Sequence, residues 1–232
     1  MSLSPVRAAS PASEVMRQLR AQVEEKGERR APSRVFAVPR EVAGLLPDAG
    51  LRPGAAYALA GAGALLHALL AEPSRAGTWC GVVGMPEMGV EAAQQAGVVL
   101  DRLVLVPEPG RRWLSAVAAL AEVLGVVAVR PGGAVAPADA ARLASRLRDR
   151  EATLLVVGEW PRAEAVLRVE EPLWSGVGDG YGNLTQREVT LTITSKRMPR
   201  PRSARLLLPG PDGQLSQAPS VVPAGRRQRA VG

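Results

Sequence analysis

A regular alternation of apolar runs and helical patterns through the middle of the chain constrains its fold more than any other feature. Five short, continuous apolar runs, which we expect to be strands, lie at 56–60, 78–83, 103–106, 126–129 and 153–157. Helical patterns lie between them, at 62–71, 89–96, 111–124 and 137–150. Strands that are apolar on both sides are typical of a parallel sheet covered by helices on both faces. The pattern therefore predicts an open, mostly parallel α/β sheet flanked by helices.

An amphipathic helix is predicted ahead of this region. Residues 1–12 are rich in Ser, Pro and Ala, and we expect them to be disordered. A helix then begins near Ser13 and ends before Gly27, and it carries an apolar stripe at helical spacing: Val15, Met16, Leu19 and Val23. An isolated helix of this length is marginal in water, so it needs a groove on its own domain or on a neighbouring molecule. Both alternatives stay open at this point.

The pattern changes after residue 157. We expect a strand at 165–169, a loop rich in Gly and Trp at 172–182, an antiparallel strand with alternating polarity at 188–194, and a last short strand at 205–208. From 209 onward the chain is rich in Pro, Gln, Ser and Gly and contains Arg226, Arg227 and Arg229, which predicts a disordered basic tail. The predicted organisation is an interaction segment (1–34), one domain (35–208) and a tail (209–232).

A glycine turn after the first strand has the strand–turn–helix layout of a phosphate-binding loop. Counting from Gly61, the positions of the second Gly, the Lys and the Ser/Thr hold Leu66, His67 and Ala68. The lysine that contacts the phosphates and the hydroxyl that binds magnesium are both missing. We therefore expect an eroded phosphate loop that binds no nucleotide. An alternative is an ATPase with an unusual loop, in which the amides of Gly61 and Gly63 hold an anion at the helix N-terminus.

The composition excludes several classes of site. Cys80 is the only cysteine and His67 the only histidine, so the chain can form no internal disulfide and no zinc site of the Cys/His type. We interpret Cys80 as a small buried hydrophobe and His67 as a packed or half-exposed helix residue. No window of 18 apolar residues and no secretory signal are found, so we expect a cytoplasmic protein without a membrane span. We expect no metal and no cofactor.

The net charge of +7 indicates an anionic partner, either nucleic acid or an acidic protein, although high-GC genomes also enrich arginine. Trp160 and Trp174 are candidates for base stacking, and the alternative is that they fill gaps beside the sheet. The candidate basic contacts to DNA or to a partner are Arg162, Lys196, Arg197, Arg200, Arg202, Arg205, Arg226, Arg227 and Arg229. The alternative is a solvated charged surface, and any binding would be independent of base sequence.

The order of these segments resembles the RecA-like fold. It resembles more closely the ImuA-prime family, the RecA-like mutasome accessory proteins of actinobacteria, which are related to the ImuA/SulA group. The resemblance rests on the helix before the domain, the approach at 46–54, the glycine turn at 61–70, the strand that leads to Glu87, and the segments 97–103, 143–157 and 189–197. It covers 35–208 and depends on order and spacing rather than on one specific motif.

The departures from the family pattern imply a loss of catalysis. Where the family has the magnesium-linked acid, Arg130 follows the strand at 126–129. Glu87 alone stands at a catalytic position, and we expect it to be solvated or paired in a salt bridge. Phosphoryl transfer depends on positioning and neutralising charge, so a chain without the Lys, the Ser/Thr and the acid is not expected to be an enzyme. The segment 131–136, where the family has a DNA-binding loop, is short.

The resemblance implies a function in the SOS response to DNA damage. It implies a non-catalytic accessory protein of translesion synthesis that binds a Y-family-like adaptor (ImuB) and, through it, an error-prone C-family polymerase and the sliding clamp. Single-stranded DNA, a second copy of the chain and RecA are further partners to consider, as is association with the nucleoid after damage. The alternatives are a sequence-independent single-strand DNA-binding module without ATPase activity and a cell-division inhibitor of SulA type.

Overall fold

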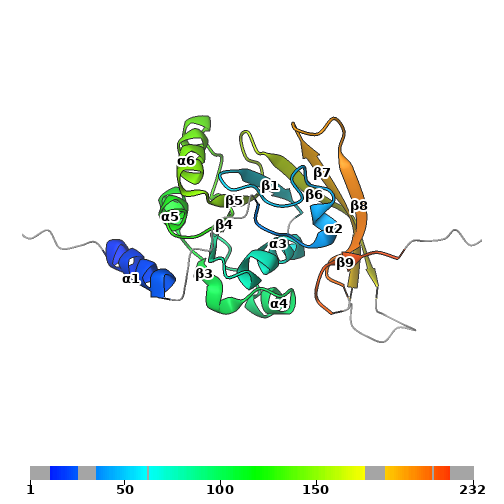
Figure 1. Cartoon of the computed structure of the whole chain (residues 1–232), viewed down its shortest axis with the longest axis horizontal. Helices are drawn as coiled ribbons and strands as arrows, with labels where there is room; N and C mark the ends of the chain where they lie inside the picture. The colour runs from blue at the N-terminus through cyan, green and yellow to red at the C-terminus, as the bar shows by residue number, and fades with distance from the viewer. Residues whose placement is uncertain (1–10, 26–34, 62, 176–185, 211, 220–232) are drawn as a thin grey trace, which may run out of the picture.

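The computed structural model describes residues 11–25, 35–61, 63–175, 186–210 and 212–219. In this part of the chain nine strands form a single sheet in the order β3-β2-β4-β5-β1-β6-β7-β8-β9 (Figure 1). The strands are β1 (Ala56–Ala60), β2 (Cys80–Val83), β3 (Leu103–Val106), β4 (Val126–Val129), β5 (Thr153–Val157), β6 (Ala165–Ser175), β7 (Gln186–Ser195), β8 (Arg202–Leu207) and β9 (Ser216–Gln217).

The sheet has a parallel half and an antiparallel half. Strands β1 to β6 pair in parallel with their neighbours, and β6 to β9 pair antiparallel. We call the edge at which β1 to β5 begin the amino edge, and the edge at which they end the carboxyl edge. Because Ala165 pairs with both Tyr57 and Ser195, the turn between β7 and β8 lies at the amino edge.

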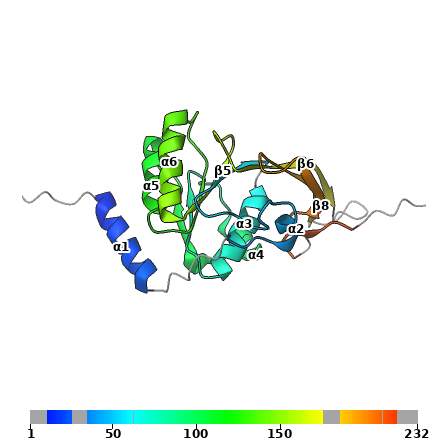
Figure 2. The same cartoon turned by 45° about the horizontal axis from the view of Figure 1, so that its top comes forward.

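Helices cover both faces of the parallel half, as the continuous apolar strands predict. The helices α2 (Arg40–Ala43), α3 (Gly63–Arg75) and α4 (Val90–Gln95) lie on one face, and α5 (Trp113–Leu120) and α6 (Pro137–Arg150) lie on the other (Figures 1 and 2). Short 3-10 turns at Leu100–Arg102 and Gly110–Arg112 precede β3 and α5. Among the described residues, no helix is long and apolar enough to cross a membrane.

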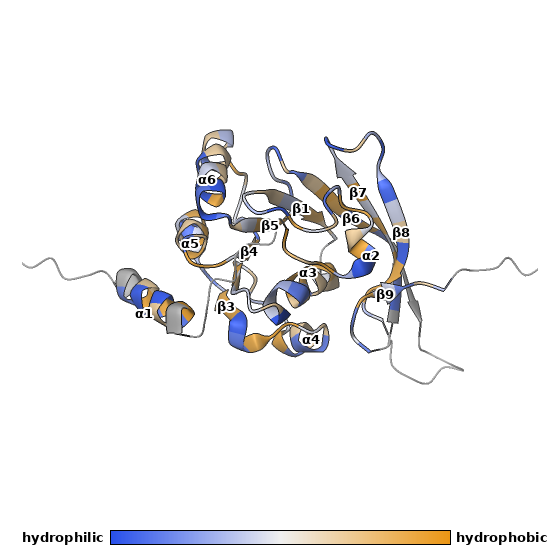
Figure 3. Cartoon of the chain, in the orientation of Figure 1, coloured by the Kyte–Doolittle hydropathy of each residue, from blue (hydrophilic) through white to orange (hydrophobic). Residues whose placement is uncertain are grey.

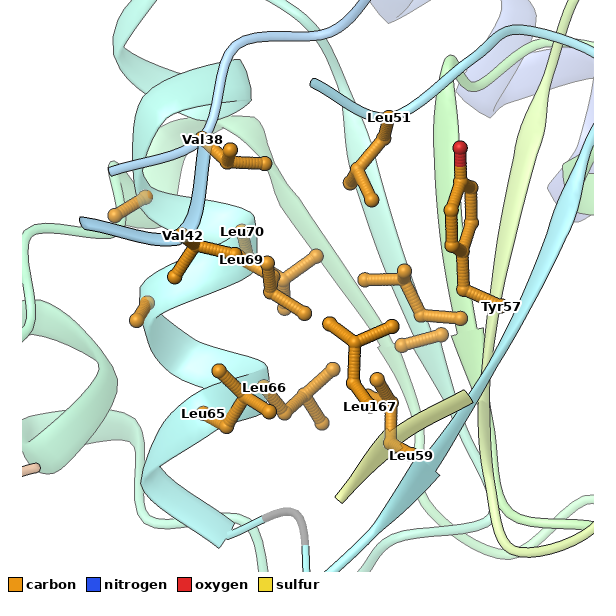
Figure 4. Packing of buried hydrophobic residues seen from close by; sticks show 14 of the residues in the cluster. Val38, Val42, Leu51, Tyr57, Leu59, Leu65, Leu66, Leu69, Leu70 and Leu167 are labelled. Atoms are coloured by element: carbon orange, nitrogen blue, oxygen red, sulfur yellow. The ribbon is translucent and has the colours of Figure 1, made fainter. Parts of the chain in front are cut away.

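The core on the α3 face is built from large aliphatic side chains. Leucines at 65, 66, 69 and 70 of α3 pack toward Leu59 of β1 and Leu167 of β6, and Val42 of α2 lies against the same helix (Figure 4). Tyr57 is fully buried at the edge of this cluster, and its hydroxyl accepts a hydrogen bond from the backbone N–H of Arg52 at 2.8 Å. Buried leucine side chains of this kind each contribute about 1.5–3 kcal/mol through removal of apolar surface from water.

The opposite face of β1 is covered by a chain crossover in place of a helix. Ala56 and Ala58 point to this face, and they share a cluster with Trp160. Residues 158–164 connect β5 directly to the parallel strand β6, and their backbone bonds back to β1, from Gly158 to Leu59 and from Glu164 to Ala56. Small side chains on β1 leave room for this segment, and the indole of Trp160 fills the space above them.

The helix α1 (Pro11–Glu25) packs on the α5 face of the sheet. Leu19 is buried in the same cluster as α5 and α6, and Met16 and Val23 pack against that cluster in part. Val15 is 61% exposed. In the described chain, three of the four residues of the predicted apolar stripe therefore contact their own domain.

The sequence placed most elements correctly and several boundaries wrongly. Four of the five core strands match their predicted bounds, and α6 does as well. The helix predicted at 111–124 is regular only over Trp113–Leu120, because the backbone turns again at 121–124 before β4. The expected disorder over 1–12 is wrong for Pro11 and Ala12, which lie in α1.

The antiparallel half is longer than predicted. β6 continues to Ser175, across a bulge after Glu170, so the loop expected at 172–182 is wrong for 172–175, and its remainder lies outside the described residues. The tail expected from 209 onward is wrong for Ser216–Gln217, which pair with β8 as β9. The strand forms because its backbone groups and that of Ala218 bond to the otherwise open edge of β8.

Candidate functional site

The glycine turn at the carboxyl edge keeps the frame of a phosphate loop but is shorter than one. β1 ends at Ala60 and α3 begins at Gly63, so only two residues connect them. A phosphate loop has four residues between its glycines, whose amides wrap the phosphate. Gly61 has a φ of +74°, and a Cβ there would lie 2.8 Å from the carbonyl oxygen of Val169. The fold alone therefore requires this glycine, without any ligand.

The three positions that would carry phosphate chemistry lie inside α3. Leu66 and Ala68 are buried in the core on this face. His67 is half-buried, and burial lowers its pKa, so the imidazole is neutral at pH 7. These residues place no positive charge beside the turn, and Leu66 and Ala68 serve packing.

Arg130 and Glu87 form an ion pair where the resemblance places the magnesium-linked acid and the catalytic glutamate. Arg130 follows β4, Glu87 lies in the loop after the neighbouring strand β2, and Val83 pairs with Val129 at the ends of these strands. Glu87 is 57% exposed, so the pair contributes at most about 1 kcal/mol to stability. The expectation of a solvated or salt-bridged Glu87 is confirmed. A guanidinium at this place repels a divalent cation, which needs oxygen ligands.

The described residues likewise offer no metal site and no reactive thiol. Over the residues that the structure describes, no group of three or more His, Cys, Asp and Glu side chains is arranged to hold a metal ion. Cys80 is fully buried, and burial raises its pKa to about 12, so the thiol is not reactive. The interpretation of Cys80 as a small buried hydrophobe is confirmed.

Trp160 is buried rather than available for stacking. Its side chain is only 8% exposed and belongs to the core beside β1. The stacking hypothesis for Trp160 is therefore wrong, and the alternative of a gap-filling residue is confirmed. Trp174 lies in β6 opposite Arg187, and its side chain is outside what the structure describes. Arg162 is exposed in the crossover, with a positive φ of 57°.

The basic residues of the β7–β8 region divide into bound and free groups. Arg197 forms ion pairs with Asp48 and with Glu164, the latter at 3.1 Å. Arg202 donates to two backbone carbonyls near α2, and Arg205 pairs with Glu188. Lys196 and Arg200 are exposed, and no interaction with another described residue holds them. The tail residues Arg226, Arg227 and Arg229 lie outside the described part.

No sequence pattern indicated the charged network to which Arg197 belongs. Glu164 also pairs with Arg52 at 2.9 Å, so two arginines share this carboxylate. The hydrogen bond from Arg197 is the main cause that lowers the pKa of Asp48. Burial raises the pKa of the adjacent Tyr57 to about 12. These partners are 112 and 149 residues apart in the chain, and no spacing rule connects them.

A pocket of about 380 Å³ lies between α2, the second half of α3 and the segment that leads to β9. Val38 contributes to its apolar lining. The charges at its rim satisfy one another, because Arg40 pairs with Glu41 and Arg75 with Glu72, each at 2.9 Å. No sequence pattern pointed to this pocket, and its internally paired charges do not select a ligand.

The arrangement of strands and helices is shared with a solved recombinase. The crystal structure of the RadB recombinase matches with a TM-score of 0.57 and 15% sequence identity, over 78% of this chain and 97% of that chain. At this identity the match shows the fold alone. The protein therefore has a RecA-like fold, with a mostly parallel sheet and an antiparallel C-terminal part, as predicted.

Sequence comparison finds a curated relative and a matching family model. The uncharacterized protein Rv3395c of Mycobacterium tuberculosis (strain ATCC 25618 / H37Rv) is 36% identical over 112 residues. The aligned part is 47% of this chain and 55% of the relative, so the chain spans about half the length of that curated relative. The model of the MT3502 N-terminal domain matches residues 44–162, which include β1 to β5 and amount to just over half of the chain. The chain therefore belongs to the MT3502 N-terminal domain family.

Proposed function

We propose that this protein is a non-catalytic accessory protein of DNA-damage-induced translesion synthesis, of the ImuA-prime type. One observation supports this most strongly. The carboxyl edge of a RecA-like sheet has a two-residue turn in place of a phosphate loop, and the Arg130–Glu87 pair in place of an acid that binds magnesium. A RecA-like domain that retains its fold without these groups is suited to binding proteins rather than to turnover.

In this role the rigid sheet holds binding surfaces in fixed positions. The principal partner is a Y-family-like adaptor (ImuB), which connects the protein to an error-prone C-family polymerase and the sliding clamp. The helix α1 offers one contact, because Val15 is exposed beside the packed Leu19. A second copy of the chain and RecA are the other partners that this surface would fit.

Co-expression of the full chain with the Y-family-like protein of the same genome tests the proposal. We expect the two to co-purify through an affinity tag on either one. Val15→Glu should weaken the complex if α1 is the contact. Val99→Glu is a matched control, because Val99 is a similarly apolar, exposed residue elsewhere on the domain. Failure of the folded chain to co-purify with that protein would contradict the bridging role.

A second candidate function is sequence-independent binding of single-stranded DNA without ATPase activity. The distribution of charge favours it. Six of the seven net positive charges lie outside the described residues, which themselves sum to +1. Such binding should weaken steeply with salt, by about 0.7 in the logarithmic slope for each single-strand phosphate contacted. Replacing Arg226, Arg227 and Arg229 by Gln should reduce that slope, and a response to salt that is flat in the unaltered chain would remove this candidate.

A further inference from the structure

Basic side chains from four separate segments meet at the amino edge of the sheet. α6 ends there because it carries the chain back from the end of β4 to the start of β5. The turn before β1, the end of the crossover and the β7–β8 turn lie at the same edge. Figure 3 shows hydrophilic residues on these segments. The cations are Arg52, Arg146, Arg148, Arg150, Arg162, Lys196, Arg197, Arg200 and Arg202.

This edge carries a local excess of positive charge within a nearly neutral domain. Five carboxylates accompany the nine cations: Asp48, Glu122, Asp149, Glu151 and Glu164. The edge segments therefore sum to +4, and the rest of the described chain sums to −3. Two acidic residues and two arginines also lie at this edge, near the end of α3 and the start of β3, and their charges cancel. The excess positive charge at this edge therefore comes from the four segments named above: the end of α6, the turn before β1, the end of the crossover and the β7–β8 turn.

Internal partners hold five of the nine cations. Arg146 and Arg150 pair with Glu122 at the end of α5, at 3.7 and 2.7 Å. Arg52 and Arg197 share Glu164, and Arg202 donates to backbone carbonyls. The other four are exposed, and their charged groups form no ion pair or hydrogen bond with another described residue: Arg148, Arg162, Lys196 and Arg200. Guanidinium groups that are free in this way match the geometry of phosphate oxygens.

The bound cations fix the positions of the free ones. Arg148 lies directly against the turn before β1, since a Cβ on Gly54 would be 3.1 Å from its Cα. Arg52, two residues earlier, connects through Glu164 to Arg197. Lys196 precedes Arg197 in the β7–β8 turn. The free side chains thus project from a backbone that ion pairs and strand pairing have already ordered, which reduces the entropy lost on binding.

We propose that the amino edge binds the phosphate backbone of nucleic acid through Arg148, Arg162, Lys196 and Arg200. This surface lies at the opposite edge of the sheet from the eroded phosphate loop, and the proposal is independent of the bridging role. Of the aromatic residues at this edge, Tyr57 and Trp79 are buried, and Phe36 packs in part against the core on the α3 face. Binding therefore depends on phosphates and not on stacking, so a duplex binds at least as well as a single strand of the same sequence.

The salt dependence of binding by the full chain tests the proposal. The probes are a labelled 20-base-pair duplex and one of its single strands, measured by fluorescence anisotropy between 50 and 200 mM salt. Each phosphate contact adds about 0.9 to the logarithmic slope on duplex DNA. Arg148→Gln with Arg200→Gln should therefore reduce the slope by about 1.8. The matched control is Arg111→Gln with Arg112→Gln, which removes the same charge from exposed residues at the carboxyl edge and should leave the slope unchanged.

Three results would overturn the proposal. The first is a wild-type slope in the Arg148/Arg200 variant. The second is an equal reduction in the Arg111/Arg112 control, which would indicate general attraction. The third is displacement of DNA by polyglutamate as readily as by unlabelled duplex, which would indicate an acidic protein partner. The basic tail contributes equally to the salt slopes of the unaltered chain and of the variant, so its contribution cancels in their difference. That difference does not depend on whether the protein binds the adaptor. Thermal melts of each variant confirm that these exposed substitutions leave the fold intact.

Discussion

The two edges of the parallel sheet differ in how their charged residues are used. At the carboxyl edge, Glu87 is 57% exposed and has a single partner, Arg130. At the amino edge, Glu164 is 14% exposed and serves two arginines, one from the turn before β1 and one from the β7–β8 turn. The amino-edge network ties the parallel half to the antiparallel half. Removal of the charged pair at the carboxyl edge should therefore disturb the fold less than removal of the shared carboxylate at the amino edge.

The largest expected effect is a difference in stability between alanine substitutions at the two glycines of the carboxyl edge, Gly61 and Gly63. Gly61→Ala introduces a side chain at a φ of +74° and 2.8 Å from a backbone oxygen, so it should reduce the free energy of unfolding by about 2–4 kcal/mol. Gly63→Ala is the control, because a Cβ there meets no atom within 4 Å and Ala favours a helix over Gly by up to about 1 kcal/mol. Urea denaturation measures both. Equal stability of the two variants would show that the turn does not require Gly61.

A second comparison removes one carboxylate from each edge. Glu164→Ala leaves the guanidinium groups of Arg52 and Arg197 without their shared acceptor, and it should cost about 1–3 kcal/mol of unfolding free energy. Glu87→Ala removes an exposed pair and should cost less than about 1 kcal/mol. Chemical denaturation of the two variants under the same conditions gives the difference directly. A greater loss from Glu87→Ala would reverse the contrast between the edges.

The same contrast explains what could be predicted from the sequence. Continuous apolar runs identified β1, β4 and β5, which are buried on both faces, and also β3, an edge strand that is only partly buried. The turn at Gly61 also followed from local spacing, whereas a solvated or salt-bridged Glu87 was expected from the catalytic residues that are missing relative to the family pattern. The Arg52–Glu164 pair followed from neither, since only the completed sheet brings these residues together.

Two strand segments escaped prediction because backbone pairing overrode a weak local signal. Pro172 and the two glutamates before it resemble a loop, yet β6 continues through them because β7 provides hydrogen-bond partners beyond the bulge. Ser216 and Gln217 show no apolar alternation, and they form β9 against the edge of β8. In both cases the neighbouring strand, rather than side-chain preference, determines the structure.

A smaller effect should appear as a dependence of stability on pH at the amino edge. The hydrogen bond from Arg197 lowers the pKa of Asp48 in the folded state. A lowered pKa stabilises the fold above the unfolded value of about 3.9, and this contribution is lost as the pH falls through the folded value. The stability difference between the unaltered chain and Asp48→Asn should therefore be constant near pH 7 and shrink below about pH 4. Urea midpoints between pH 7 and 2.5 measure it, and a difference that does not change with pH would contradict the network.

The smallest expected effect concerns nucleotide binding at the carboxyl edge. Arg130→Asp restores an acid where the resemblance places the magnesium-linked residue, but it leaves the two-residue turn at Gly61 and the neutral His67 unchanged. Without a loop of sufficient length and without a lysine, an added carboxylate cannot assemble a site for a triphosphate and its metal. Calorimetry with Mg²⁺ and ATP should show no binding by the unaltered chain or by the variant. The repulsion between Glu87 and the new aspartate should lower stability by less than about 1 kcal/mol, because both are exposed. The contrary result would be ATP binding that appears only in the Arg130→Asp variant and only with Mg²⁺. It would show that the carboxyl edge still forms a nucleotide site despite its short turn.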